Sequence, residues 1–106
     1  MSFCVVQDIP DGNQVMYDDT CEKLGITEQN PQWPDGMITH IAGPSNSGGW
    51  CIVSEWESKE QFEIFRDERL LPLVEGTGRS IAPPIAFEVY REYHAESLVG
   101  QRFKAA

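Results

Sequence analysis

The residue of this chain best suited to acid–base chemistry is His40, which lies in the middle of the apolar stretch Met37 to Ala42. A neutral imidazole in apolar surroundings could accept a proton or form a hydrogen bond with a phenolic ligand. The structural alternative, which is the commoner one for a strand histidine, is a buried ring that bonds a neighbouring hydroxyl such as Ser54 or lies at a subunit interface. His40 is therefore the candidate catalytic residue.

Arg66 and Arg69 form a second candidate feature. A helical wheel that starts from Phe62 and Phe65 places both arginines inside the apolar arc, where a charge needs a partner. One reading is that a guanidinium points into a cleft and binds a carboxylate or an enolate. The other is that the arginines turn outward before Pro72 or form ordinary ion pairs. The acidic candidates for such pairs are Glu63, Asp67 and Glu88.

Aromatic residues supply the remaining candidates for a binding site. Tyr17 and Tyr90 could each offer a hydroxyl to a bound aromatic molecule, although a helical tyrosine at i, i+4 spacing is usually part of the core. Trp56 and Phe65 could stack against the same molecule. The candidate ligand-binding residues are therefore Tyr17, Trp56, Phe62, Phe65, Arg66, Arg69 and Tyr90.

No metal or cofactor site is predicted. The two histidines, His40 and His94, occur in no HxxxH or ExxH spacing, and three scattered cysteines do not make a closed zinc site. No segment resembles a phosphate loop or a dinucleotide fingerprint, which argues against tightly bound flavin or nicotinamide. The cysteines are an odd number without a CxxC motif, so we expect reduced, structural thiols. They are Cys4, Cys21 and Cys51.

The elements that position these residues follow an alternating pattern. Strands with β-rich composition are separated by helical periodicity, by Gly and Pro turn signals and by a capping box at Ser58 and Gln61. Asp11 or Asn13 caps the first helix, and Pro72 should end or kink the second. The predicted elements are a strand over Phe3 to Ile9, a helix from Asn13 to Gly25, a loop over Thr27 to Gly36, strands over Met37 to Ala42 and Trp50 to Trp56, a helix from Ser58, a loop over Glu75 to Pro84, and a strand over Ile85 to Tyr93.

This order, β-α-β-β-α-β, predicts an α+β fold of the ferredoxin-like type with a four-stranded antiparallel sheet. The two middle strands should form a hairpin across GPSNSGG. If residue 40 pairs with residue 52, His40 shares one sheet face with Trp50, Ile52, Ser54 and Trp56. The side chains on both faces of these strands are largely apolar, so the sheet face without helices needs another element to cover it. A second sheet would serve.

Composition limits the class of protein. A chain of 106 residues with 41% hydrophobic residues fits a single domain, 1–106, and its small core favours an oligomer. The net charge of −9 disfavours nucleic acid and anionic membranes as partners, and no apolar run is long enough to span a bilayer. The N-terminus lacks the pattern of a signal peptide, so we expect a soluble, cytoplasmic protein.

The series HIAGP, GGW and SEWESKEQF resembles the dimeric α+β-barrel superfamily, which includes the antibiotic-biosynthesis monooxygenase type and the stress-responsive barrel type. The resemblance covers roughly residues 3–90 and is strongest in W-E-S-x-x-x-F at Trp56 to Phe62. It implies a homodimer in which two four-stranded sheets face each other as a barrel. It also implies a ligand cleft between sheet and helices in each subunit, with Trp33 closing a barrel end.

Haem-degrading members of that superfamily carry a tryptophan and a histidine on the second helix. This chain has Phe65 about where that tryptophan would be and no histidine from Arg66 to Ser80, which disfavours a haem site.

The resulting hypothesis is that the protein binds a small aromatic or polyketide-like molecule and converts it without a cofactor, by oxygenation, cyclisation or isomerisation. His40 or a tyrosinate would take the proton, and an arginine would stabilise the anion. The alternative is a non-catalytic binding or stress-related dimer. An empty cleft of a few hundred Å³ with His40 or Arg69 at its wall favours the first hypothesis, and a filled interior favours the second.

Overall fold

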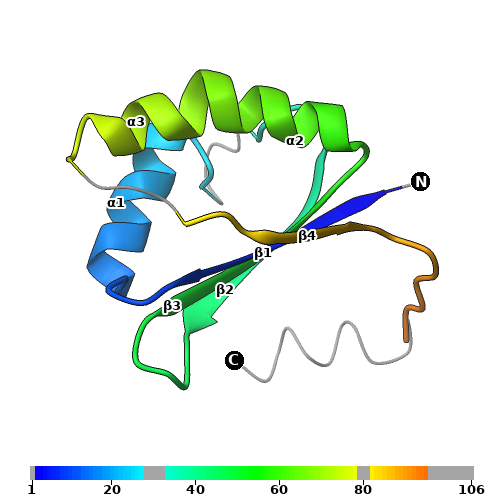
Figure 1. Ribbon diagram of the computed structural model, residues 1–106, viewed down its shortest axis with the longest axis horizontal. Coiled ribbons are helices and arrows are strands. Elements are labelled where there is room, and N and C mark those ends of the chain that lie inside the picture. Colours follow the sequence, from blue (N-terminus) through cyan, green and yellow to red (C-terminus); the bar gives the residue numbers. More distant parts are fainter. Residues whose placement is uncertain (1, 28–32, 79–81, 96–106) are drawn as a thin grey trace.

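The computed structural model describes residues 2–27, 33–78 and 82–95, which form a small α+β structure (Figure 1). Its four strands are antiparallel and lie in the order β2-β3-β1-β4. The element order β-α-β-β-α-β and this strand order are consistent with the predicted ferredoxin-like topology. The elements are β1 (Phe3–Ile9), α1 (Gln14–Leu24), β2 (Met37–Pro44), β3 (Trp50–Trp56), α2 (Lys59–Phe65), the π-helical turn η1 (Arg66–Leu70), α3 (Leu71–Glu75) and β4 (Ile85–Glu88).

Helix α1 begins and ends with the caps that its sequence offers. The side chain of Asn13 accepts a hydrogen bond of 2.9 Å from the backbone N–H of Met16, so Asn13, and not Asp11, is the N-cap. Gly25 follows the helix with φ 76°, the left-handed conformation that closes a helix end at low steric cost. These caps fix both ends of α1 over the sheet.

The second helical segment is longer than predicted. Its start is at the predicted S-x-x-Q motif, where Ser58 is the N-cap: its hydroxyl accepts a hydrogen bond from the backbone N–H of Gln61 and donates one to the Gln61 side chain. Pro72 was expected to end or kink the helix, but the chain stays helical through Glu75. The turn before the proline widens instead, with the N–H of Leu71 bonded to the carbonyl of Arg66 five residues back. Such π-helical turns occur often at functional sites.

The hairpin register differs from the predicted one by two residues. His40 pairs with Ser54 and not with residue 52, because the hairpin closes where Pro44 faces Trp50. Since side chains alternate along a strand, a shift of two residues leaves His40 on the predicted face.

The predicted last strand, Ile85 to Tyr93, is too long. β4 ends at Glu88, and only one further bond, from the N–H of Val89 to the carbonyl of Ser2, extends its pairing. The neighbouring strand β1 begins at Phe3, so residues beyond Val89 have no strand beside them to pair with.

Helices cover one face of the sheet and enclose the core. The buried side chains come from β1, α1, β3 and α2, and Trp56 is the most fully buried of the aromatic ones at 1% exposure. Its indole N–H donates to Ser54 at 3.0 Å, and its ring packs against Phe62 and Phe65 at centroid distances of 5.6 and 5.2 Å. The core cluster consists of Phe3, Val5, Leu24, Trp56, Phe62 and Phe65.

The opposite face of the sheet, which we call the open face, has an apolar middle and carries no helix among the described residues. The strand registers place four β-branched side chains in one row across all four strands. The edge members of this row, Ile41 and Ile85, are 60% and 71% exposed, and Phe87 nearby is 50% exposed. The row consists of Ile41, Val53, Val6 and Ile85.

Replacing Trp56 by alanine should lower the free energy of unfolding by about 3–5 kcal/mol, because a large buried ring is lost and its neighbours fill the cavity only in part. Unfolding in urea, followed by circular dichroism, measures the change. Trp33→Ala is a matched control, since Trp33 is 42% exposed, and its loss should be clearly smaller. Equal losses in the two variants would contradict the central place of Trp56 in the core.

Candidate functional site

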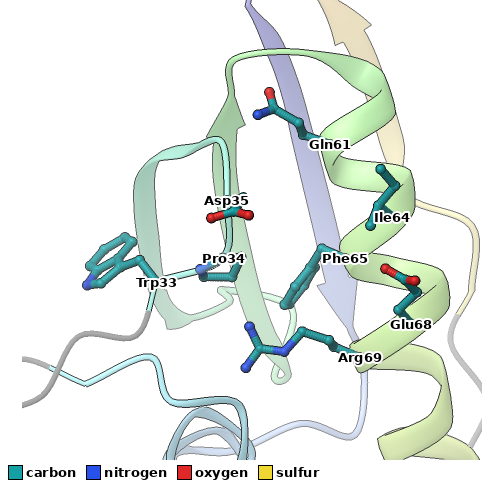
Figure 2. Close-up of a pocket in the computed structure, with 8 residues that line it drawn as sticks. All are labelled: Trp33, Pro34, Asp35, Gln61, Ile64, Phe65, Glu68 and Arg69. Carbon is teal, nitrogen blue, oxygen red and sulfur yellow. The ribbon is translucent and has the colours of Figure 1, made fainter.

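A cleft of about 350 Å³ lies between the segment 33–36 and the helical segment α2–η1 (Figure 2). One wall is the irregular chain before β2, and the other is the helix face that follows Gln61. The cleft therefore forms where the loop passes in front of the helix. Its lining residues are Trp33, Pro34, Asp35, Gln61, Ile64, Phe65, Glu68 and Arg69.

Gly36 holds the loop wall close to the helix. It has φ 89°, a left-handed conformation that favours glycine, and a Cβ at this position would come within 2.5 Å of the Gln61 side chain, so a larger residue would be strained and would displace that side chain. The carbonyl of Gly36 accepts a hydrogen bond of 2.8 Å from the N–H of Glu57, just before the helix. This backbone bond ties the loop wall to the chain that enters the helical wall.

Arg69 reaches from η1 towards the loop (Figure 2). One of its terminal N–H groups donates to the carbonyl of Leu24 at the end of α1, and its guanidinium carbon lies 5.8 Å from the centre of the Phe65 ring. No carboxylate among the described residues forms an ion pair with it. Arg69 is therefore an oriented cation with N–H groups still available to a ligand.

Arg66 lies one turn earlier and forms ordinary ion pairs, which is the second arrangement predicted for the two arginines. Its guanidinium bonds Asp67 at 2.9 Å and lies 3.9 Å from Glu63. The hydrogen bond with Arg66 lowers the pKa of Asp67, and the same bond raises the pKa of Arg66. The two arginines thus differ: Arg66 forms ion pairs on the surface, and Arg69 lines the cleft.

His40 forms a short hydrogen bond with Tyr17 of α1, at 2.5 Å between the hydroxyl oxygen and Nε2. Burial is the main reason that the pKa of Tyr17 is raised, and burial also lowers the pKa of His40. Both groups are therefore neutral near pH 7, and the tyrosine O–H can donate to Nε2. The expected tyrosinate base is not supported at Tyr17, because its buried site disfavours the anion.

The predicted contact between His40 and Ser54 is not formed. Ser54 accepts from the indole of Trp56 instead, and Tyr17 takes its place as the hydroxyl partner of the imidazole. The ring of Tyr17 also packs against Trp50, at a centroid distance of 5.3 Å. Two buried nitrogens, His40 Nδ1 and Trp50 Nε1, have no hydrogen-bond partner among the described residues.

Trp33 connects the histidine with the cleft. Its ring lies edge-on to His40 at a centroid distance of 6.5 Å, and the same side chain lines the cleft. His40 itself is not part of the lining. The Tyr17–His40 pair therefore lies behind Trp33, one side chain away from a molecule in the cleft.

The structure divides the other predicted ligand-binding residues between cleft, core and surface. Phe65 lines the cleft, whereas Trp56 and Phe62 lie in the core behind it. Tyr90 is 85% exposed with Arg91 over its ring, and it does not line the cleft. The residues that sequence reasoning missed come mainly from the loop and the outer helix face, where no motif marks them. They are Trp33, Pro34, Asp35, Gln61, Ile64 and Glu68.

Three further findings concern metal ions, thiols and membranes. Across residues 2–27, 33–78 and 82–95, no three His, Cys, Asp or Glu side chains come together in a way that could hold a metal ion. The thiols of Cys4, Cys21 and Cys51 are free. None of the helices in the described part of the chain is long and apolar enough to cross a membrane.

Fold and site together define a small α+β protein with a four-stranded antiparallel sheet, an apolar row on the open sheet face and a cleft on the helical side. No family model, no curated protein and no solved structure matches the chain. The resemblance to the dimeric α+β-barrel superfamily stays a prediction that depends on the sequence motifs and the order of the elements.

The free energy of unfolding should fall as the pH is lowered from about 7.5 to 5.5. Burial lowers the pKa of folded His40 below its ordinary value of 6.5, so the unfolded chain binds a proton in this range before the folded chain does. This loss of stability is absent well above pH 6.5, and it grows as the pH falls until the pH passes the lowered pKa of folded His40. His40→Gln should therefore lose less stability between the two pH values than the unchanged protein, as measured by urea unfolding.

His94→Gln is the control for this experiment, because the side chain of His94 is 65% exposed. The loss of stability between pH 7.5 and 5.5 should be smaller in His40→Gln than in His94→Gln. If His40→Gln lost as much stability between pH 7.5 and 5.5 as the unchanged protein, the buried imidazole would not be the source of the pH dependence.

Proposed function

We propose that this protein binds a small planar molecule, aromatic or polyketide-like, in the cleft between the segment 33–36 and the helix, and that it does so as a homodimer. The observation that carries the proposal is Arg69, a cation held in place at the wall of an open cleft. A guanidinium with free N–H groups is suited to bind a carboxylate or an enolate in two-point contact.

The two arginines of this helical segment differ in their partners. Arg66 forms an ion pair with Asp67. Arg69 forms none, within the described residues, although Asp35 and Glu68 line the same cleft. Its geometry therefore favours an anionic group from outside the chain.

The apolar part of the cleft suits a flat ligand. The Phe65 ring lies under the Arg69 guanidinium, Trp33 and Pro34 form the opposite wall, and Ile64 adds an aliphatic side chain. A volume of about 350 Å³ is near the lower end of the range for small-molecule sites, which favours a compact ligand of one or two rings.

Conversion of the ligand is a second candidate function, and the Tyr17–His40 pair favours it. A neutral histidine bonded at 2.5 Å to a tyrosine could move a proton during a cofactor-independent oxygenation, cyclisation or isomerisation. Arg69 would then stabilise the resulting anion. The reacting atom would have to lie at the Trp33 end of the cleft, since His40 lies behind that ring. If a molecule bound in the cleft stays chemically unchanged, this result would support binding without conversion.

The homodimer is proposed from the open face. A row of four β-branched side chains crosses the whole sheet, and its exposed edge members would gain from burial. A second copy of the same sheet presents the same row, so two copies can cover each other by a two-fold axis. This arrangement would give the barrel of two facing sheets.

Light scattering at micromolar concentration should give the mass of a dimer, and Ile41→Glu should give a monomer with an unchanged circular dichroism spectrum. The substitution places a charge in the apolar row, where burial against a partner would be costly. Val15→Glu, on α1 and on the other side of the sheet, is the matched control because Val15 is 80% exposed, and it should stay dimeric. A monomeric unchanged protein would contradict the barrel.

Mass spectrometry of molecules carried through native purification should detect an organic acid bound to the unchanged protein. Arg69→Met should lose this molecule or bind it at least about tenfold more weakly, because a charge-assisted hydrogen bond is removed. Arg66→Met keeps the cleft intact and should bind as the unchanged protein does. Equal retention by the two variants would contradict the role assigned to Arg69.

A further inference from the structure

The cleft that we propose as a binding site carries charges of both signs. Arg69 contributes its guanidinium, and Asp35 and Glu68 contribute carboxylates. Neither carboxylate forms an ion pair with Arg69, although all three side chains line one cleft of about 350 Å³. Opposite charges thus face the same space without neutralising each other.

A ligand with only a negative charge would match this cleft poorly. Its acidic group could bind Arg69, but the lining as a whole holds one cation and two carboxylates, on a chain whose net charge is −9. The field of such a surface repels simple anions. A ligand with only a positive charge would leave Arg69 without its partner. Both mismatches disappear when the ligand carries one group of each sign.

Each charge is attached to a wall that the backbone holds in place. The carbonyl of Leu24 and the ring of Phe65 orient Arg69. Asp35 directly precedes Gly36, whose carbonyl is bonded to the N–H of Glu57 at the start of the helical wall. Figure 2 shows Asp35 on the loop side of the gap and Arg69 reaching across from the helix, with Pro34 on the loop wall and Phe65 on the helical wall. Opposite charges on the two walls favour a ligand that meets both at once.

We propose that the ligand is an aromatic zwitterion, a free amino acid or a close amino-carboxylate analogue. Its carboxylate binds Arg69, its ammonium group binds Asp35, and its ring lies against Phe65 and Trp33. This inference depends on the proposed function, since it names the class of molecule that the same cleft takes. It goes further by requiring an amine on the ligand, which Arg69 alone does not.

Isothermal titration calorimetry with three indoles of matched shape tests the proposal on the full chain. Tryptophan carries both charged groups, indole-3-propionate only the carboxylate, and tryptamine only the amine. Tryptophan should bind most tightly, and each of the other two at least about tenfold more weakly, because each lacks one charged hydrogen bond. Indole-3-propionate binding as tightly as tryptophan would overturn the inference and leave the proposed function standing.

Variants of the two walls assign the contacts. Asp35→Asn should weaken tryptophan and tryptamine and leave indole-3-propionate unchanged, whereas Arg69→Met should weaken tryptophan and indole-3-propionate and leave tryptamine unchanged. Asp67→Asn, which breaks the surface pair with Arg66, is the control and should change none of the three affinities. Thermal unfolding of each variant checks that the fold is intact.

Two other results would count against the inference. Failure of both tryptophan and phenylalanine to bind at millimolar concentration would overturn it, and the proposed function would still stand if Arg69→Met lost an organic acid that the unchanged protein retains. If no acid binds to either form, the inference and the proposed function fall together.

Discussion

The burial of the Trp56 indole is the interaction on which the helical side of this protein depends. The strand β3 ends at Trp56, Ser58 caps α2 two residues later, and Phe62 and Phe65 then close over the indole. Because Phe65 is both a core residue and a wall of the cleft, the same contact that places the helix also places the site. The position of Arg69 four residues further along is a consequence of this packing.

Much of the fold follows from local sequence signals. The strands, the N-cap at Ser58 and the element order were predictable because turn residues and periodicity mark them along the chain. The predictions that failed concern how one strand pairs with another. The register at His40 depended on where the hairpin closes, and the length of the last strand depended on where β1 begins. The widened turn before Pro72 also kept a helix intact that a simple proline rule would end.

The candidate site was less predictable than the fold, because it joins segments that are far apart in sequence. A helical wheel puts Arg66 and Arg69 in one arc, and only the structure shows that one finds acidic neighbours and the other reaches the cleft. The bond between Tyr17 and His40 joins α1 to β2, and no spacing rule connects them. Asp35 lies in an irregular loop, where the sequence carries no period from which to infer direction.

The alternation of side chains along β3 has a consequence for how this protein can change over evolution. Trp56 faces the helices, and Val53, three residues earlier, faces the open side, so the cleft lining and the apolar row have no residue in common. Substitutions that alter one surface leave the packing of the other in place. A duplicated copy could therefore acquire a different subunit as its partner while keeping its ligand, or keep its partner while its ligand changes.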